Sequence, residues 1–158
     1  MIYGFRQVGP QDAALLRDWR SRTHVAEWWG PPGEDDEPEE EWVSRWVVGL
    51  EGRDFAYLQD YAVHAEPGHH FAHLPQGARG IDQYIGEADM LGRGHGHRLI
   101  AQRVDELFAA GVPVVATDPH PDNARAIAAY RKAGFSVAGP PQETRWGRIL
   151  PMTVRQVS

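Results

Sequence analysis

The sequence predicts a single mixed α/β domain built around one sheet. Its 158 residues are enough for one substantial core, and 42% of them are hydrophobic. Alternating or continuously apolar segments, typical of strands, are interleaved with segments of helical periodicity. A glycine-rich stretch, residues 92–96, directly precedes a helical segment, and a short, almost wholly apolar strand follows that helix. This order predicts two parallel strands joined through the helix.

The first third of the chain predicts one strand and two helices. Residues 2–8 alternate apolar and polar side chains, which indicates a strand. Pro10 opens a helix that continues to about Arg20 with an apolar side. Residues 23–29 predict a second, short helix. Residues 34–41 then form an acidic run, which is either a solvated surface segment or a rim that attracts a cationic substrate.

The middle of the chain predicts three strands and a long loop. Residues 42–50 and 55–63 indicate two strands joined by a hairpin at Glu51-Gly52. Residues 66–77 are rich in glycine and proline, so we expect a mobile polar flap over a site. Residues 79–86 indicate a strand with polar residues where a core strand would be apolar.

Four histidines at this loop raise the question of a metal site: His64, His69, His70 and His73. Their spacing is not that of an H-E-x-x-H helix, and the chain has no cysteine. We therefore predict no metal at these positions.

The last third predicts two helices and three strands. A helix is expected over residues 98–110, and residues 112–118 indicate a buried central strand. Asn123 is placed to cap a further helix over residues 124–132. Two final strands are expected over residues 135–138 and 148–155.

Charge and composition narrow the classes of partner. A net charge of −6 argues against nucleic acid as the main partner and suits a cationic small molecule. Eight of the 22 acidic residues lie between Glu27 and Glu41. No apolar run approaches the roughly eighteen residues of a membrane span, and no signal peptide is evident, so we expect a cytoplasmic protein. Monomer and homodimer both remain open.

The stretch from Gly92 to His97 indicates a phosphate-binding loop. Glycine tolerates positive φ, which lets backbone N–H groups converge on an anion, and a helix start adds unpaired donors. A dinucleotide fingerprint would need glycine where His97 or Leu99 stands, and a P-loop would need Lys-Ser/Thr after Gly96. The alternative is a glycine-rich turn that only opens a helix. Supporting charge would come from Arg93, His95, His97 and Arg98.

Asp82 is the candidate catalytic side chain in the strand before this loop. A carboxylate within a strand is costly unless it has a task or a partner. The alternatives are that Asp82 pairs with Arg79 or caps the following turn. The absence of cysteine excludes an acyl-cysteine intermediate, so any acyl transfer would be direct.

Several motifs together resemble the GNAT acetyltransferases. Residues 126–135, AIAAYRKAGF, fit the pattern A-x-x-x-Y-x-K-x-G-F and lie downstream of the G-x-G loop. More narrowly, the chain resembles the aminoglycoside 6′-N-acetyltransferases of the Ib type. The matching segments are EWWG at 27–30, the hairpin at 46–63, RGIDQ at 79–83, LGRGHG at 91–96, TDP at 117–119 and residues 123–135.

The resemblance implies a GNAT fold, in which a mixed, mostly antiparallel twisted sheet is flanked by helices and splayed at the acetyl-CoA site. Acetyl-CoA would be the cofactor, with contacts from Ile81, Gln83, Gly92, Arg93, Gly94, His95, Gly96, His97 and Asn123. The aminoglycoside would contact Trp28, Trp29, Gln59, Tyr61, Asp82 and Asp118, with Asp118 on a second amine.

The resemblance also implies two catalytic roles. Asp82 would be the general base or the group that orients the substrate ammonium. Tyr130 would be the general acid that reprotonates the departing thiolate, and the alternative is that it only packs against the sheet. A carboxylate beside the nucleophile makes chemical sense, because an amine attacks a thioester only as the free base.

Two departures bear on the substrate. The segment between Gly33 and Trp42 is shorter than in the Ib-type enzymes, and residues 66–77 are rich in histidine where those enzymes carry paired tryptophans and acids. The alternatives are therefore another small amine, such as a siderophore precursor or a polyamine, or a non-catalytic acyl-CoA-binding module.

Overall fold

The computed structural model of the chain describes residues 2–30 and 41–156. The acidic run at 34–41 lies outside these residues except for Glu41, and so does the shortened connection after Gly33. Both expectations for that segment therefore stay predictions.

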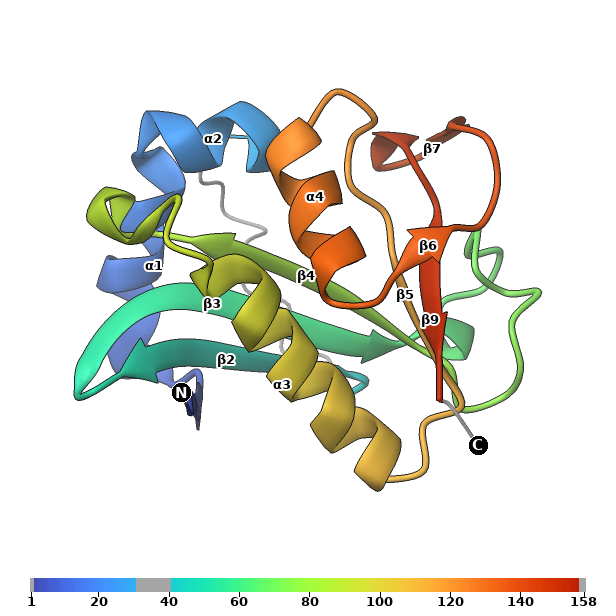
Figure 1. The fold of residues 1–158 in the computed structure, drawn as a ribbon, viewed down its shortest axis with the longest axis horizontal. Coiled ribbons are helices and arrows are strands. Elements are labelled where there is room, and N and C mark those ends of the chain that lie inside the picture. Colours follow the sequence, from blue (N-terminus) through green and yellow to red (C-terminus); the bar gives the residue numbers. More distant parts are fainter. Residues whose placement is uncertain (1, 31–40, 157–158) are drawn as a thin grey trace.

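One mixed sheet forms the centre of the described molecule (Figure 1). Only β4 and β5 pair in parallel, and every other neighbouring pair is antiparallel, which confirms the predicted fold class. In sheet order the strands are β1 Gly4–Gln7, β2 Val43–Leu50, β3 Arg53–Ala62, β4 Arg79–Ile85, β5 Val114–Thr117, β9 Met152–Arg155 and β6 Ser136–Val137. The separate hairpin consists of β7 Gln142–Thr144 and β8 Gly147–Ile149.

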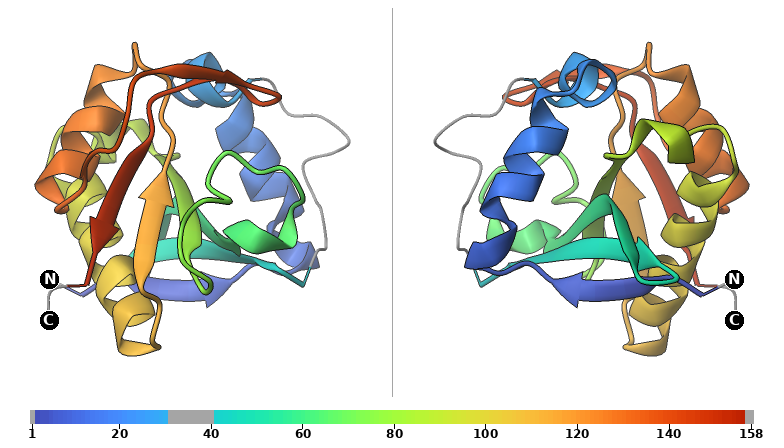
Figure 2. Two further views of the ribbon diagram at one scale, coloured as in Figure 1. Left: turned by 90° about the vertical axis from the view of Figure 1, so that its right-hand side faces the viewer. Right: turned by 90° about the vertical axis from the view of Figure 1, so that its left-hand side faces the viewer.

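Helices cover both faces of the sheet (Figure 2). On one face lie α3 His95–Ala109 and α4 Ala124–Lys132; on the other lie α1 Ala13–Ser21, α2 Thr23–Trp29 and the loop at 66–77. Short 3₁₀ turns occupy Pro10–Asp12, Val63–Ala65 and Ala88–Met90. The strands alternate accordingly: Val48, Leu58 and Ile81 pack toward α3, whereas Val47, Tyr57 and Tyr84 pack toward α1.

The parallel pair β4–β5 is short, and this shapes the sheet. Arg79 pairs with Val115 and Gly80 with Ala116, and no further register is shared by the two strands. Beyond that point the Thr117 hydroxyl donates to the Ile81 carbonyl at 2.9 Å. A side chain therefore takes the place of a ladder hydrogen bond, and the two strands diverge as the resemblance implied.

A buried carboxylate joins the elements at the end of the sheet where β4 and β5 are paired. Asp60 on β3 is fully buried and accepts hydrogen bonds from Arg79 Nε at 2.8 Å, Arg103 Nε at 3.0 Å and Trp46 Nε1 at 3.1 Å. The cluster joins β2, β3, β4 and α3 around one charge. Because Arg79 is engaged with Asp60, it is not the partner of Asp82, which excludes that interpretation of Asp82.

Two predicted boundaries are wrong. Helix α3 begins at His95 instead of residue 98, because Gly94 adopts the left-handed N-cap conformation with φ 82°. The strand expected at 148–155 is divided into β8 and β9. Pro151 has no N–H for a ladder, and the N–H of Leu150 donates to the Pro119 carbonyl at 2.8 Å. Strand β7 was not predicted.

The loop at 66–77 also differs from the expected mobile polar flap. Phe71 and Leu74 are buried at its centre and pack with Val63, Ala78 and Val114. His64 Nε2 lies 2.9 Å from the Leu74 carbonyl. The histidines had suggested a polar surface, but the apolar residues between them anchor the loop to the sheet.

The Asp60 cluster gives a stability prediction. Asp60→Asn removes the buried carboxylate that pairs with both Arg79 and Arg103, and we expect the free energy of unfolding to fall by about 3–5 kcal/mol in urea denaturation. Asp54→Asn is the matched control. Asp54 pairs with Arg6 at the surface, so its loss should cost less than about 1 kcal/mol. Equal losses in the two variants would contradict this account.

Candidate active site

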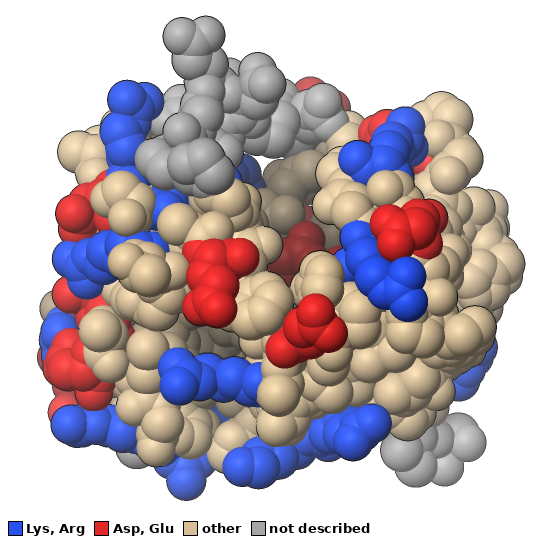
Figure 3. Space-filling view, turned by 90° about the horizontal axis from the view of Figure 1, so that it is seen from above, with Lys and Arg blue, Asp and Glu red and all other residues tan. Residues whose placement is uncertain are grey.

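A cleft of about 460 Å³ opens between α2, the start of α4 and the β7–β8 hairpin. Figure 3 shows the surface hollowed there, with acidic side chains in the floor of the hollow. Every residue predicted to contact substrate lines this cleft: Trp28, Trp29, Gln59, Tyr61, Asp82 and Asp118. Tyr130, Gln83 and Asn123 line it as well.

Asp82 is held by its cross-strand neighbour. Gln59 stands directly opposite Asp82 in the β3–β4 register, and its Nε2 donates to Asp82 Oδ2 at 3.0 Å. The Tyr57 hydroxyl donates to Gln59 Oε1 at 2.7 Å and in turn accepts from Arg45 Nε at 3.0 Å. The period of two along the strands puts these groups on one face, so the chain of hydrogen bonds fixes the Asp82 carboxyl.

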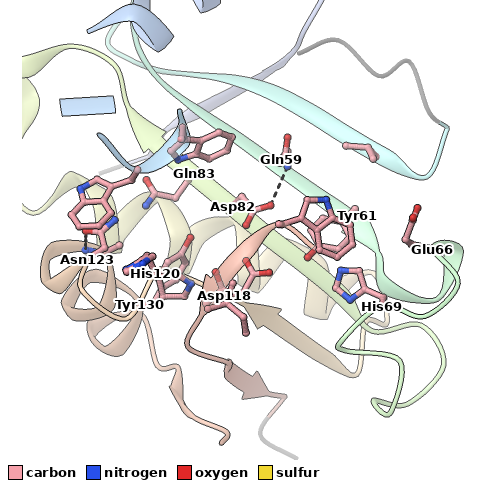
Figure 4. A pocket seen from close by; sticks show the side chains of 18 of the residues that line it. Gln59, Tyr61, Glu66, His69, Asp82, Gln83, Asp118, His120, Asn123 and Tyr130 are labelled. Atoms are coloured by element: carbon pink, nitrogen blue, oxygen red, sulfur yellow. Dashed lines mark hydrogen bonds between the residues drawn. The ribbon is translucent and has the colours of Figure 1, made fainter. Parts of the chain in front are cut away.

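Asp82 and Asp118 form a carboxyl pair in the middle of the cleft (Figure 4). Asp118 follows β5 directly, and its carboxyl lies close enough to that of Asp82 for the two charges to interact. Burial, and then the charge of Asp118, raise the pKa of Asp82 well above its usual value. Burial also raises the pKa of Asp118 to about 6. The titration of each carboxyl therefore depends on the charge of the other.

Tyr130 reaches the cleft from the other face of the sheet. Its ring packs against Phe135 with centroids 5.3 Å apart, as the packing interpretation requires, but its side chain also lines the cleft beside Thr117 and Gln83, at the gap between β4 and β5. Burial, and then the nearby charge of Asp82, raise the pKa of Tyr130. The hydroxyl is therefore protonated at neutral pH and available as a donor.

The gap between the diverging strands exposes backbone groups of β4. The Ile81 carbonyl accepts from Thr117, and the Ile85 carbonyl lies 2.9 Å from His24 Nε2. In an antiparallel ladder alternate residues face the same way, so the N–H and C=O of Gln83 also point away from β3 into the gap. The side chain of Ile81 is buried in the core, which leaves only its backbone for a ligand.

The predicted phosphate loop has the expected backbone. Gly92 and Gly94 both adopt positive φ, 71° and 82°, and a Cβ on Gly92 would meet no atom within 4 Å. Gly94 is the N-cap of the fifteen-residue helix α3, whose first amides lack partners within the helix. The residues from 92 to 97 lie outside the lining of the cleft described above.

His95 does not fit the predicted side-chain role at this loop. Its Nδ1 lies 2.9 Å from the Tyr3 hydroxyl, and its ring packs edge-on to Phe55. Burial, chiefly, lowers its pKa. A buried neutral ring adds no positive field to the loop, so only the backbone of His95 is placed to bind an anion.

Asn123 performs the predicted capping role. Its Oδ1 accepts from the Ala126 N–H at 3.2 Å, which satisfies one donor of the first turn of α4. Its side chain is therefore already engaged, and the contact to a cofactor stays a prediction.

Sequence reasoning missed one wall of the cleft. Trp146, at the tip of the unpredicted β7–β8 hairpin, lines the cleft and lies 5.2 Å, between ring centroids, from His69. Arg145 beside it pairs with Glu66 at 3.1 Å, which joins the hairpin to the loop at 66–77. His120 on the opposite side lies beside Trp28, with the ring centroids 5.8 Å apart and the ring planes tilted by 40°. The glycine at position 147 was the sequence signal that could have indicated this hairpin turn, since it adopts a positive φ of 114° there.

The histidines near the cleft have partners of other kinds. Over residues 2–30 and 41–156, no group of three or more His, Asp or Glu side chains is arranged to hold a metal ion. His69 Nδ1 accepts from the Phe71 N–H at 3.0 Å.

Among the same described residues, no helix has both the length and the apolar character that a membrane crossing requires.

Known proteins share this fold and these segments. Residues 9–141 match the family model of the acetyltransferase (GNAT) domain. The aminoglycoside N(6′)-acetyltransferase type 1 of Klebsiella pneumoniae is 35% identical over 150 residues, which covers 85% of this chain and 74% of that protein. A kanamycin resistance protein of Rhizobium radiobacter is 47% identical over 64 residues, 40% of this chain and 59% of the relative.

A solved structure extends the likeness over the whole fold. The crystal structure of the aminoglycoside acetyltransferase AAC(6′)-Ib in complex with coenzyme A and kanamycin superposes with a TM-score of 0.89 at 33% sequence identity. The match covers 98% of this chain and 95% of that one.

The raised pKa of Asp82 predicts a pH-dependent gain in stability on its removal. A carboxyl whose pKa is raised by folding stabilises the protein at low pH, and this contribution is lost as the pH rises through the folded-state pKa. Asp82→Asn avoids that loss. We expect the thermal unfolding midpoint of the variant, relative to wild type, to increase between pH 5 and pH 8 in calorimetry. A difference that stays constant with pH would argue against a raised pKa.

Proposed function

The chain belongs to the GNAT acetyltransferase family, and we propose that it transfers an acetyl group from acetyl-CoA to the 6′-amine of an aminoglycoside. The observation that carries the proposal is the Asp82–Asp118 carboxyl pair, which lies beside the Tyr130 hydroxyl where β4 and β5 diverge. The similarity to aminoglycoside acetyltransferases over 85% of the chain supports the choice of substrate class.

The proposed cofactor fits the backbone of two segments. The turn with Gly92 and Gly94 and the start of α3 suit a diphosphate, because they offer backbone N–H groups and open space. The backbone of Gln83 at the gap suits an extended pantetheine chain, and an N–H at this edge suits the developing oxyanion. Arg93, Gly96 and His97 remain proposed contacts around the diphosphate. Acetyl-CoA would supply a thioester as the acyl donor.

The proposed chemistry divides between the two faces of β4. Asp82 accepts a proton from the substrate ammonium as the amine nitrogen becomes nucleophilic. Its raised pKa makes it a stronger base than an ordinary aspartate, which suits this task near neutral pH. Tyr130 holds a proton at its hydroxyl, which goes to the departing thiolate. No side chain forms a covalent bond to the acyl group.

The cleft suits a cationic, sugar-like acceptor. The paired carboxyls attract ammonium groups, and the rings of Trp28, Trp29 and Tyr61 offer flat apolar surfaces.

One observation favours a different small amine as the second candidate. Glu66 is neutralised by Arg145 at 3.1 Å, so among the described lining residues Asp82 and Asp118 are the carboxyls left for cationic groups.

The substrate proposal predicts acetyl transfer that depends on a free 6′-amine. Thiol release from acetyl-CoA should be measurable with kanamycin, and it should be absent with aminoglycosides that lack this amine. Asp82→Asn should lower kcat/KM by about 10²–10⁴-fold, the range for a lost general base. Asp105→Asn, on the exposed side of α3, should leave the rate unchanged. Binding of acetyl-CoA without turnover of any aminoglycoside would refute the substrate, and a panel of other amines would then test the second candidate.

The diphosphate loop predicts a selective loss of cofactor affinity. Gly94→Ala places a Cβ at φ 82°, only 3.4 Å from His97, and we expect coenzyme A to bind about tenfold more weakly in calorimetry. Gly111→Ala is the matched control, because Gly111 has φ 96° at the other end of the same helix. Both variants carry the same kind of backbone strain. Equal affinities for coenzyme A would show that the loop does not hold the diphosphate.

A further inference from the structure

His70 makes a contact with the carboxyl pair that the proposed mechanism has not used. Its Nε2 lies 2.8 Å from Asp118 Oδ2, and the two side chains are only 7% and 16% exposed. His70 comes from the loop at 66–77, whereas Asp118 follows β5. The chain thus places a histidine in contact with Asp118, whose charge in turn acts on Asp82.

The position of the proton on His70 follows from its other ring nitrogen. Nδ1 is buried and has no hydrogen-bond partner among the described residues. An unpaired buried N–H is rarer than an unpaired acceptor. The proton therefore sits on Nε2, which donates to Asp118, and Nδ1 carries the lone pair. Asp118 is the acceptor of this bond and hence the more strongly charged member of the carboxyl pair.

The surroundings keep the ring in this orientation and neutral. His70 stacks on His69 with centroids 4.1 Å apart, and it packs against Phe71 at 4.5 Å and Trp146 at 5.7 Å. The titratable and charged groups that face it are Asp118, Asp82, Arg145 and His69. Burial, and the positive charge of Arg145, lower the pKa of His70 against the opposing effect of Asp82.

We propose that His70 is a positioning residue for acetyl transfer, because its Nε2–H holds Asp118 in the charged form, so that a proton on the carboxyl pair resides on Asp82. When the ammonium of the acceptor enters, this proton is released to solvent, and Asp82 is then free to accept the proton of the amine. Without His70, the pair would retain its protons to higher pH. This inference rests on the proposed function for its catalytic consequence, although the bond to Asp118 does not depend on the substrate.

The test compares the pH dependence of kcat/KM in two variants of His70. His70→Phe keeps a flat ring but has no hydrogen-bond donor. The acid limb of its kcat/KM profile should therefore lie about one pH unit higher, which lowers kcat/KM about tenfold at pH values below the limb. His70→Gln places an amide N–H near the position of Nε2 and should restore the wild-type limb. The same amine is used throughout, so its own titration is common to all the profiles. His73→Gln, exposed in the same loop, is the control and should not shift the limb.

A second measurement separates this inference from the proposed function. Carboxyl ¹³C NMR of the protein alone should show a higher pKa for Asp118 in His70→Phe than in wild type or His70→Gln. If the Phe variant does not fold, His70→Asn, whose shorter side chain cannot reach Asp118, replaces it. An unchanged Asp118 titration, or an equal shift in the Gln variant, would overturn the role of His70. Absence of acetyl transfer in wild type would instead overturn the proposed function. The NMR result would then still decide whether His70 donates its hydrogen bond to Asp118.

Discussion

The divergence of β4 and β5 after only two paired residues is the constraint on which the site depends. A continued ladder would pair the backbone of Gln83 and close the gap between the two faces of the sheet. The Thr117 hydroxyl satisfies the Ile81 carbonyl, so the sheet can open without leaving that buried acceptor unpaired. Asp82 and Tyr130, which belong to opposite faces, meet across the opening.

Two aspartates on neighbouring strands show how surroundings assign different tasks to the same residue type. Asp60 faces two arginines and a tryptophan N–H, and it joins four elements at the paired end of the sheet. Asp82 faces a glutamine amide and another carboxyl at the open end. The first carboxylate is fully compensated, whereas the second has no cationic hydrogen-bond partner among residues 2–30 and 41–156. An incoming ammonium is the kind of group that would supply one.

The sequence predicted what is set by local pattern. The strands of the β2–β3 hairpin, the capped helix α4 and the positive φ of Gly92 and Gly94 all follow from rules that act within a few residues. The residues expected around the substrate do lie in one cleft, and they could be predicted because the resemblance to a known family supplied their positions. The His70–Asp118 hydrogen bond and the position of Trp146 in the cleft wall could not be predicted from the sequence. Each contact joins segments that are distant in the chain, and a local pattern of side chains carries no information about such packing.

The alternation of side chains along β4 has a consequence for how this chain tolerates change. Asp82 and Gln83 are consecutive and point to opposite faces, so each is assigned to its side by strand register alone. A single inserted or deleted residue between Gly80 and Asp82 would turn the carboxylate toward the face of the sheet that α3 covers, away from Gln59. We therefore expect β4 to be intolerant of length variation, in contrast to surface loops, where additions and losses of residues are absorbed without moving the reacting groups.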